Sequence, residues 1–167
     1  MAATYTPIAT STLSSAATGV TFSSIPSGYT DLIIVCSIKS GTIDSLRMQF
    51  NSDTGTNYSF TGINGSGTAA SYWNASNQAK IEIYTPSDAS EYTPFILQFN
   101  NYSNSTTYKN VIIRGGSVTA SNTDKGAKAM IGLWRNTSAI NTIYLYNGTT
   151  NNWLTGCSFT LYGIQAA

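Results

Sequence analysis

The sequence contains no histidine. Imidazole is the base in Ser-His-Asp triads and Cys-His pairs, and it is a frequent ligand of catalytic zinc. Its absence excludes these nucleophile pairs and most catalytic zinc sites. Many familiar hydrolase mechanisms are therefore closed to this chain.

Charge is also scarce, at 9% of residues with a net charge of +1, whereas soluble domains usually carry about 25% charged residues. The eight basic residues form no cluster, so we expect no nucleic-acid partner. A surface with few charges gains little from repulsion against self-association. This composition favours a protein that works in an assembly, and a monomer with a hydroxyl-rich surface is the alternative.

The acidic residues are few and scattered, and most lie in expected turns. A glycosidase requires two carboxylates that face one cleft, and no such pairing is visible among the seven acids. We interpret them as turn caps and solubilising groups: Asp31, Asp44, Asp53, Asp88, Asp124, Glu82 and Glu91. The sequence therefore predicts that the protein is not an enzyme, with no cofactor and no metal site.

Only two cysteines occur, Cys36 and Cys157, which is too few for a disulfide framework. Both lie in apolar strand patterns, where a free cysteine behaves as a small hydrophobic residue. We expect buried free thiols, and a single disulfide or a functional thiol is the alternative.

Long apolar runs are missing as well. No stretch approaches the roughly 18 residues that a membrane span needs, so we expect no membrane insertion. The N-terminal MAATYTPIAT has neither the basic start nor the apolar centre of a signal peptide. We therefore expect synthesis in a cytosol.

Short runs rich in Ile, Val, Thr, Tyr and Phe are present, and turn signals separate them at regular intervals. This pattern is typical of an all-β sandwich or barrel. Residues 46–50, 95–99 and 157–161 alternate, with apolar side chains on one face. Residues 32–35 are apolar at successive positions, and residues 127–134 carry apolar side chains on both faces, which indicates central strands covered on both faces.

The expected strands number about ten to twelve. Eight fill a jelly-roll-like antiparallel sandwich, and the others form an N-terminal arm and added hairpins. We therefore predict an extended arm over residues 1–18 and a β-sandwich domain over residues 19–167. An immunoglobulin-like sandwich is the alternative, although its usual Cys-Trp-Cys pattern is not cleanly present.

Two turns can be assigned from local sequence. Asn147-Gly148 follows the alternating run IYLY, and an Asn-Gly pair supplies the positive φ angles of a two-residue hairpin. We therefore predict a hairpin there. The segment from Asp53 to Asn57 lacks the spacing of a calcium loop, and an Asx-turn explains it better.

Aromatic residues are numerous for so polar a chain, with eleven Tyr and three Trp. Exposed rings can form a protein interface, where Tyr and Trp are enriched. They can also stack on sugar rings while Asn and Ser bind the hydroxyls. The third interpretation is the ordinary preference of Tyr for a half-exposed sheet.

Four blocks of the sequence support a family resemblance. They are FSSIPSGYTDLIIV (22–35), RMQFNSDTGTNYS (47–59), GLWRNTSAINTI (132–143) and FTLYGI (159–164). In this order they resemble a β-sandwich domain that is widespread in the virion proteins of tailed phages. Members of that group occur in head decoration (cement) proteins and in tail fibres. The resemblance implies a virion structural protein made in the host cytoplasm, and it supplies no catalytic residues.

The resemblance leaves two functions open. The domain fills nearly the whole chain, which fits a decoration protein on the outer surface of the head, a homotrimer that bridges neighbouring major capsid subunits. Its expected contacts are Tyr5, Ile8 and Leu13 of the arm and the exposed Trp153. The alternative is a tail component or tail-fibre tip that recognises host surface polysaccharide, with Tyr72, Trp73 and Tyr102, together with Trp153, stacking on sugars.

Overall fold

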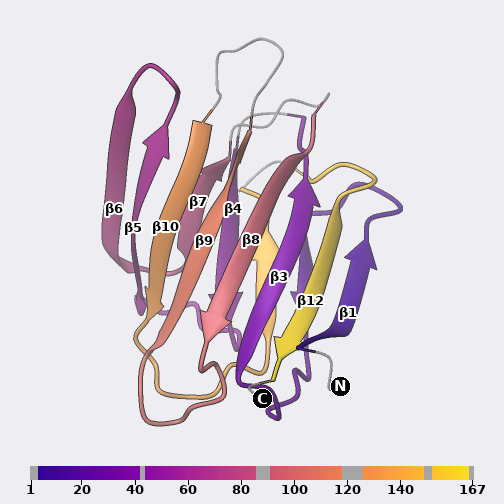
Figure 1. The fold of residues 1–167 in the computed structure, drawn as a ribbon, viewed down its shortest axis with the longest axis vertical. Coiled ribbons are helices and arrows are strands. Elements are labelled where there is room, and N and C mark those ends of the chain that lie inside the picture. Colours follow the sequence, from indigo (N-terminus) through magenta and orange to yellow (C-terminus); the bar gives the residue numbers. More distant parts are fainter. Residues whose placement is uncertain (1–3, 42–43, 86–90, 118–125, 149–151, 166–167) are drawn as a thin grey trace.

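The computed structural model describes residues 4–41, 44–85, 91–117, 126–148 and 152–165. Within these ranges the protein is all β, without a helix, and two antiparallel sheets pack face to face as a sandwich (Figure 1). The predicted fold class is confirmed. No helix long and apolar enough to cross a membrane occurs in these ranges.

One sheet has eight strands and the other has four. The large sheet runs in the order β1 (Tyr5–Thr12), β12 (Ser158–Ile164), β3 (Asp31–Ile38), β8 (Thr93–Asn100), β9 (Lys109–Ser117), β10 (Gly126–Trp134), β5 (Tyr58–Gly65) and β6 (Ala70–Gln78). The small sheet runs in the order β2 (Gly19–Phe22), β11 (Ile143–Tyr146), β4 (Asp44–Phe50) and β7 (Ile81–Thr85).

Eight of these strands form a jelly roll. The antiparallel pairs β1 with β12, β2 with β11, β3 with β8 and β4 with β7 together make one long ribbon that folds over on itself. Folding the ribbon brings β12 beside β3 in one sheet and β11 beside β4 in the other. The first and third pairs thereby form one four-stranded layer of a double-sheet jelly roll, and the second and fourth pairs form the other.

The other four strands are two inserted hairpins. The β5–β6 hairpin lies between β4 and β7 in the chain, and the β9–β10 hairpin lies between β8 and β11. Because β9 pairs with β8, and β10 pairs with both β9 and β5, the two hairpins continue the large sheet beyond the jelly roll. The sheet therefore ends in β1 on one side and in β6 on the other (Figure 1).

The leader takes part in the large sheet. Residues 5–12 form β1 and pair with β12 along the edge of the large sheet, with an irregularity between Pro7 and Ala9. The start of the expected arm thus contributes an edge strand to the sandwich.

The core lies between the two sheets and follows the predicted alternation. The inward-facing side chains of β4, β8 and β12 are almost completely buried: Leu46, Met48, Phe50, Phe95, Leu97, Phe99, Phe159 and Leu161. The central strand β3 departs from the prediction at one position. Its residues 32–34 are buried, but Val35 is 43% exposed on the outer face of the large sheet. The strand is therefore not covered along its whole length on both faces.

Both cysteines are buried free thiols, as predicted. Burial raises the pKa of the Cys36 thiol to about 12 and also raises that of Cys157. The Cys157 sulfur lies against the backbone of Lys39, whose N–H donates to it at 3.2 Å. Neither side chain has the low pKa that a reactive thiolate needs.

The predicted hairpin at Asn147-Gly148 is wrong. The strand before it, β11, already pairs with β2 on one side and β4 on the other. β11 therefore has no free edge with which the following residues could form a hairpin. The Asn147 N–H instead donates a hydrogen bond to the Thr18 carbonyl. Long-range pairing has overridden a local turn signal.

The Asx-turn at Asp53 is confirmed. Its carboxylate accepts hydrogen bonds from the Gly55 N–H at 2.8 Å, from the Asn57 amide at 2.9 Å and from the Trp134 indole N–H at 2.7 Å. Burial by itself would raise the pKa of this carboxyl, but the three hydrogen bonds outweigh that effect and hold the pKa below its usual value. Asp53 thereby fastens the loop after β4 to the end of β10.

Acid is expected to weaken the fold through Asp53. Its pKa is lower in the folded chain than in the unfolded chain, so the unfolded chain binds the proton more tightly and stability falls as the pH drops through the folded pKa. The Asp53→Asn variant should be about 1–2 kcal/mol less stable than the parent at neutral pH. The difference should shrink as the pH falls through the lowered pKa of the folded chain, where the parent carboxyl also becomes neutral. Urea unfolding followed by circular dichroism measures the stability difference between variant and parent at neutral and at acid pH. The same difference at both would contradict this role of Asp53.

Candidate functional site

The outer face of the large sheet exposes apolar side chains where the inserted hairpins extend it. Alternation along each strand turns one set of residues to the core and the other set outward. The outward set includes Ile63 of β5, Tyr72 of β6, Ile112 of β9 and Ile131 of β10, which are 63%, 80%, 39% and 48% exposed. We call these four residues the outer patch.

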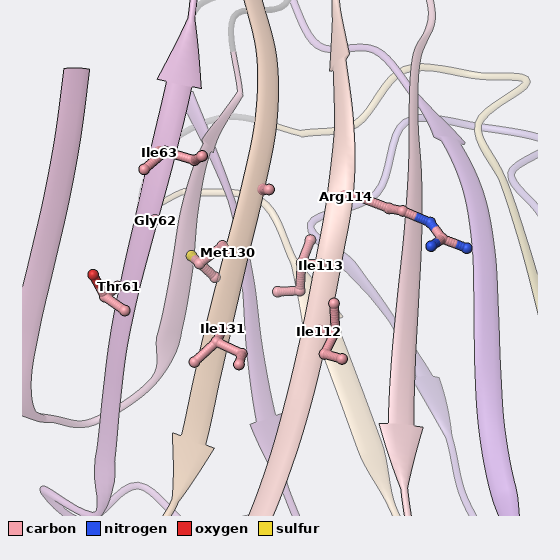
Figure 2. A pocket seen from close by; sticks show the side chains of 9 residues that line it. Thr61, Gly62, Ile63, Ile112, Ile113, Arg114, Met130 and Ile131 are labelled. Atoms are coloured by element: carbon pink, nitrogen blue, oxygen red, sulfur yellow. The ribbon is translucent and has the colours of Figure 1, made fainter. Parts of the chain in front are cut away.

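Strand register brings the outer patch together. Ile63 of β5 lies opposite Tyr72 of β6 on one side and Ala129 of β10 on the other. One step along the sheet, Ile131 of β10 lies opposite Ile112 of β9. Figure 2 shows Ile63, Ile131 and Ile112 on three neighbouring strands of this face. The Cβ atoms of directly opposed residues in a sheet lie about 4.5–5.5 Å apart, so the patch is continuous.

Two shallow hollows adjoin on this face and share Thr61 and Ile131. The larger, of about 460 Å³, is open to solvent and includes the small side chain of Ala129 in its lining. Its lining is almost entirely apolar and consists of Thr61, Gly62, Ile63, Ile112, Ile113, Arg114, Ala129, Met130 and Ile131. The second, of about 270 Å³, lies toward β6.

Charge is scarce on this part of the face. Among the outward-facing residues of β5, β6, β9 and β10 in the described ranges, Arg114 is the only charged one. The two lysines of β9 and β10, Lys109 and Lys128, point inward and are buried. Lys109 donates to the carbonyls of Thr107 and Thr137 at 2.6 and 3.0 Å. The larger hollow therefore lacks the several convergent polar groups that fix a small ligand in place. The second hollow is more polar, because its lining residues include Ser59, Thr61, Asn74 and Ser76.

The opposite side of the sandwich is more polar. On the outer face of the small sheet, Arg47 pairs with Glu82 at 2.7 Å, and Lys80 lies 3.4 Å from the same carboxylate. The rings of Tyr144 and Tyr146 stack beside them, with centroids 4.8 Å apart. No group of three or more His, Cys, Asp or Glu side chains that could hold a metal occurs in the described ranges.

The predicted contacts of the leader lie along β1 and just after it. Tyr5 is 54% exposed, whereas Ile8 and Leu13 are partly buried against the core. Of these three, Tyr5 presents the most side chain to a partner.

The prediction that Trp153 is an exposed contact is wrong. Its side chain is 1% exposed and packs on Phe159, with ring centroids 4.7 Å apart. Its backbone bridges Ala17 and Ser40, which draws the ring into the core. Trp153 is therefore a core residue that joins the leader to the end of β3.

The residues proposed for sugar stacking do not form one site. Tyr72 points outward from β6, while its neighbour Trp73 points to the other face and lies against Gly62. Tyr102 is completely buried, and its hydroxyl donates to the Pro26 carbonyl. The expectation that Tyr102 is available to a glycan is wrong, because a loop tyrosine here fills the core.

Sequence reasoning identified Tyr72 but missed Ile63, Ile112 and Ile131 as site residues. The signal for Ile131 was present, since residues 127–134 are apolar on both faces. In the structure the even-numbered residues of β10 face inward, and the odd-numbered residues, Ile131 among them, face outward.

Comparisons of the chain with protein-family models, with curated proteins and with solved structures give no match.

Proposed function

We propose that the protein is a structural component of a tailed-phage virion, a head decoration protein that attaches to the major capsid protein. The observation that carries the proposal is the outer patch: a continuous, exposed, apolar face beside which Arg114 is the only charged outward-facing residue of the described parts of β5, β6, β9 and β10. Exposed apolar patches of this kind mark interaction sites. The four sequence blocks supply the virion context, and the patch supplies the means of attachment.

A protein surface suits this face better than a small ligand does. The larger hollow is open, and its lining offers little hydrogen bonding. A charged or strongly polar partner would be desolvated there without compensation. The matching surface on a capsid subunit should therefore be neutral and apolar at its centre, with an acidic group placed to meet Arg114.

Repetition makes such modest contacts sufficient. Burying one exposed isoleucine contributes about 1.5–3 kcal/mol, and much of this is offset by the cost of association. A capsid lattice presents the same surface many times, so a protein that contacts more than one subunit gains through multivalency. A nearly uncharged docking face is useful in this setting because it needs no charge pairing.

The tail alternative has less support. Its stacking residues are dispersed, as described above, and two of them are buried. The stacked pair of Tyr144 and Tyr146 favours sugar binding, but both rings are half-buried. We therefore place attachment to the head first.

Attachment should fail when a charge is placed in the patch. The protein is first stripped from purified heads, and purified protein is then added back and sedimented with them. The parent should rebind and raise the temperature at which heads open. Ile131→Lys should bind at least about tenfold more weakly, since a lysine would be buried without a partner.

The matched control is Thr21→Lys, an exposed position on the small sheet, which should rebind like the parent. Both variants change exposed side chains and should keep the parent's stability within about 0.5 kcal/mol. Rebinding of Ile131→Lys at parental strength, or heads of unchanged heat stability after rebinding, would refute the proposal.

A further inference from the structure

The edge strand β6 has the features of a strand that pairs with another strand. In the described part of the chain no strand lies beyond it in the large sheet. It spans nine residues, most of them exposed. Its edge therefore carries a row of backbone N–H and C=O groups that face away from β5 and can pair with a further strand.

The other edges of the two sheets carry protection that β6 lacks. Pro7 and a register shift interrupt β1, β2 has only four residues, and charged Lys80 and Glu82 stand at the start of β7. By contrast, no charged residue and no proline occurs between Asp53 and Lys80. The bulge of β6 is confined to its C-terminal end, where Asn77 has a φ of 55° and the register shifts. A regular stretch remains over residues 70–75.

The turn before β6 shows which backbone groups are available. The Ser66 N–H donates to the Ala69 carbonyl at 2.9 Å across this turn. Antiparallel pairs alternate between bonded and non-bonded along the ladder. Counting from this pair, Ser71, Trp73 and Ala75 bond to β5, so the N–H and C=O groups of Ala70, Tyr72 and Asn74 point to the open edge.

We propose that β6 pairs with β6 of a second copy of this chain, antiparallel and across a two-fold axis at Tyr72. In this register Ala70 of each copy lies opposite Asn74 of the other. The backbone groups of Ala70, Tyr72 and Asn74 that point to the open edge therefore all pair with the second copy. A strand paired with itself brings like residues together, which is unfavourable when they are charged. The absence of charge in β6 removes that barrier.

Continuity with the outer patch supports a second copy as the occupant. Tyr72 and Ile63 belong to the patch and lie at and beside the open edge. Pairing across the axis would join the two patches into one apolar face on a continuous sheet. An isologous contact of this kind uses each edge once and closes as a dimer, in contrast to the trimer that the family resemblance implies.

The mass of the full chain in solution tests the pairing without any phage head, so its result is independent of the proposed function. Sedimentation equilibrium should give twice the chain mass of 17.8 kDa. Asn74→Pro removes the backbone N–H that residue 74 points to the open edge. An edge strand tolerates proline at such a position. It should be monomeric at concentrations where the parent and the control Asn74→Ala are dimeric, with an unchanged circular dichroism spectrum.

A cross-link reports the register and does not depend on the proline variant folding. Tyr72→Cys places two cysteines opposite each other at the axis, within the Cα spacing that a disulfide accepts, and the native thiols are buried. Mild oxidation should convert most of Tyr72→Cys to a disulfide-linked dimer. The control Thr10→Cys, exposed on the opposite edge strand, should not cross-link. A monomeric or trimeric parent, a dimeric Asn74→Pro, or equal cross-linking of the two cysteine variants would overturn the proposal.

Discussion

Replacing Trp134 by alanine is expected to lower the free energy of unfolding by about 3–5 kcal/mol. Trp134 ends β10 and is completely buried. Its ring meets Phe50 of the small sheet edge-on, with centroids 5.5 Å apart, and stacks on Tyr58 of β5 at 6.4 Å. Its indole N–H donates to Asp53. The side chain therefore connects the inserted hairpins to the small sheet and to the loop after β4.

Two further variants separate packing from hydrogen bonding. Trp134→Phe keeps a ring but leaves one acceptor site of Asp53 unused, so it should lose about 1–3 kcal/mol. In a double-mutant cycle with Asp53→Asn, the two losses should not add, because both changes weaken one interaction. Urea unfolding followed by far-ultraviolet circular dichroism gives the values. A loss below about 1 kcal/mol for Trp134→Ala would show that the site is not part of the central packing.

The core could be predicted because it depends on a local rule. In β4, β8 and β12 every second residue is apolar, and a period of two assigns those residues to one face. Leu46, Leu97 and Leu161 are therefore found inward without knowledge of which strands are neighbours. The jelly-roll arrangement followed from the number and spacing of the strands, although sequence did not show which strands were the additions.

Residues outside regular strands could not be placed by that rule. Trp153 and Tyr102 lie in irregular segments, where nothing local states whether a ring faces solvent or core. Both are drawn inward by backbone contacts with distant parts of the chain. The hairpin at Asn147-Gly148 fails for a related reason, since local turn preference competes with two long-range strand pairings of β11 and loses.

The outer patch could be predicted only in part. Apolar residues on both faces of residues 127–134 predict a strand that is covered on both sides, but in the structure only the inner face of β10 is covered. Sequence does not state whether the cover comes from this chain or from another molecule, so Ile131 was expected to be buried and is half exposed. Ile63 and Ile112 join it only through the register of β5 and β9 with β10. Such pairing of segments distant in sequence has no local signal.

Introducing a side chain at Gly115 should disrupt the seam between the jelly roll and the inserted hairpins. Gly115 of β9 lies directly opposite Phe95 of β8. A Cβ at this position would overlap the Pro94 carbonyl oxygen and the Phe95 ring. The carbonyl belongs to the backbone and cannot rotate aside, so the two strands must separate. We expect Gly115→Val to cost about 3 kcal/mol, at the upper end of what overpacking usually costs.

Gly65→Val is the matched control, because Gly65 lies in β5 of the same extended sheet and a Cβ there meets nothing within 4 Å. Valine favours strands, so this variant should stay within about 0.5 kcal/mol of the parent. Thermal and urea unfolding of the two variants, which add the same side chain to strands of one sheet, measure the difference. Equal stability of the two would mean that β8 and β9 can separate at little cost. The inserted hairpins would then be a loosely attached addition to the jelly roll, and the outer patch that they carry would lack the rigid support that docking on a lattice requires.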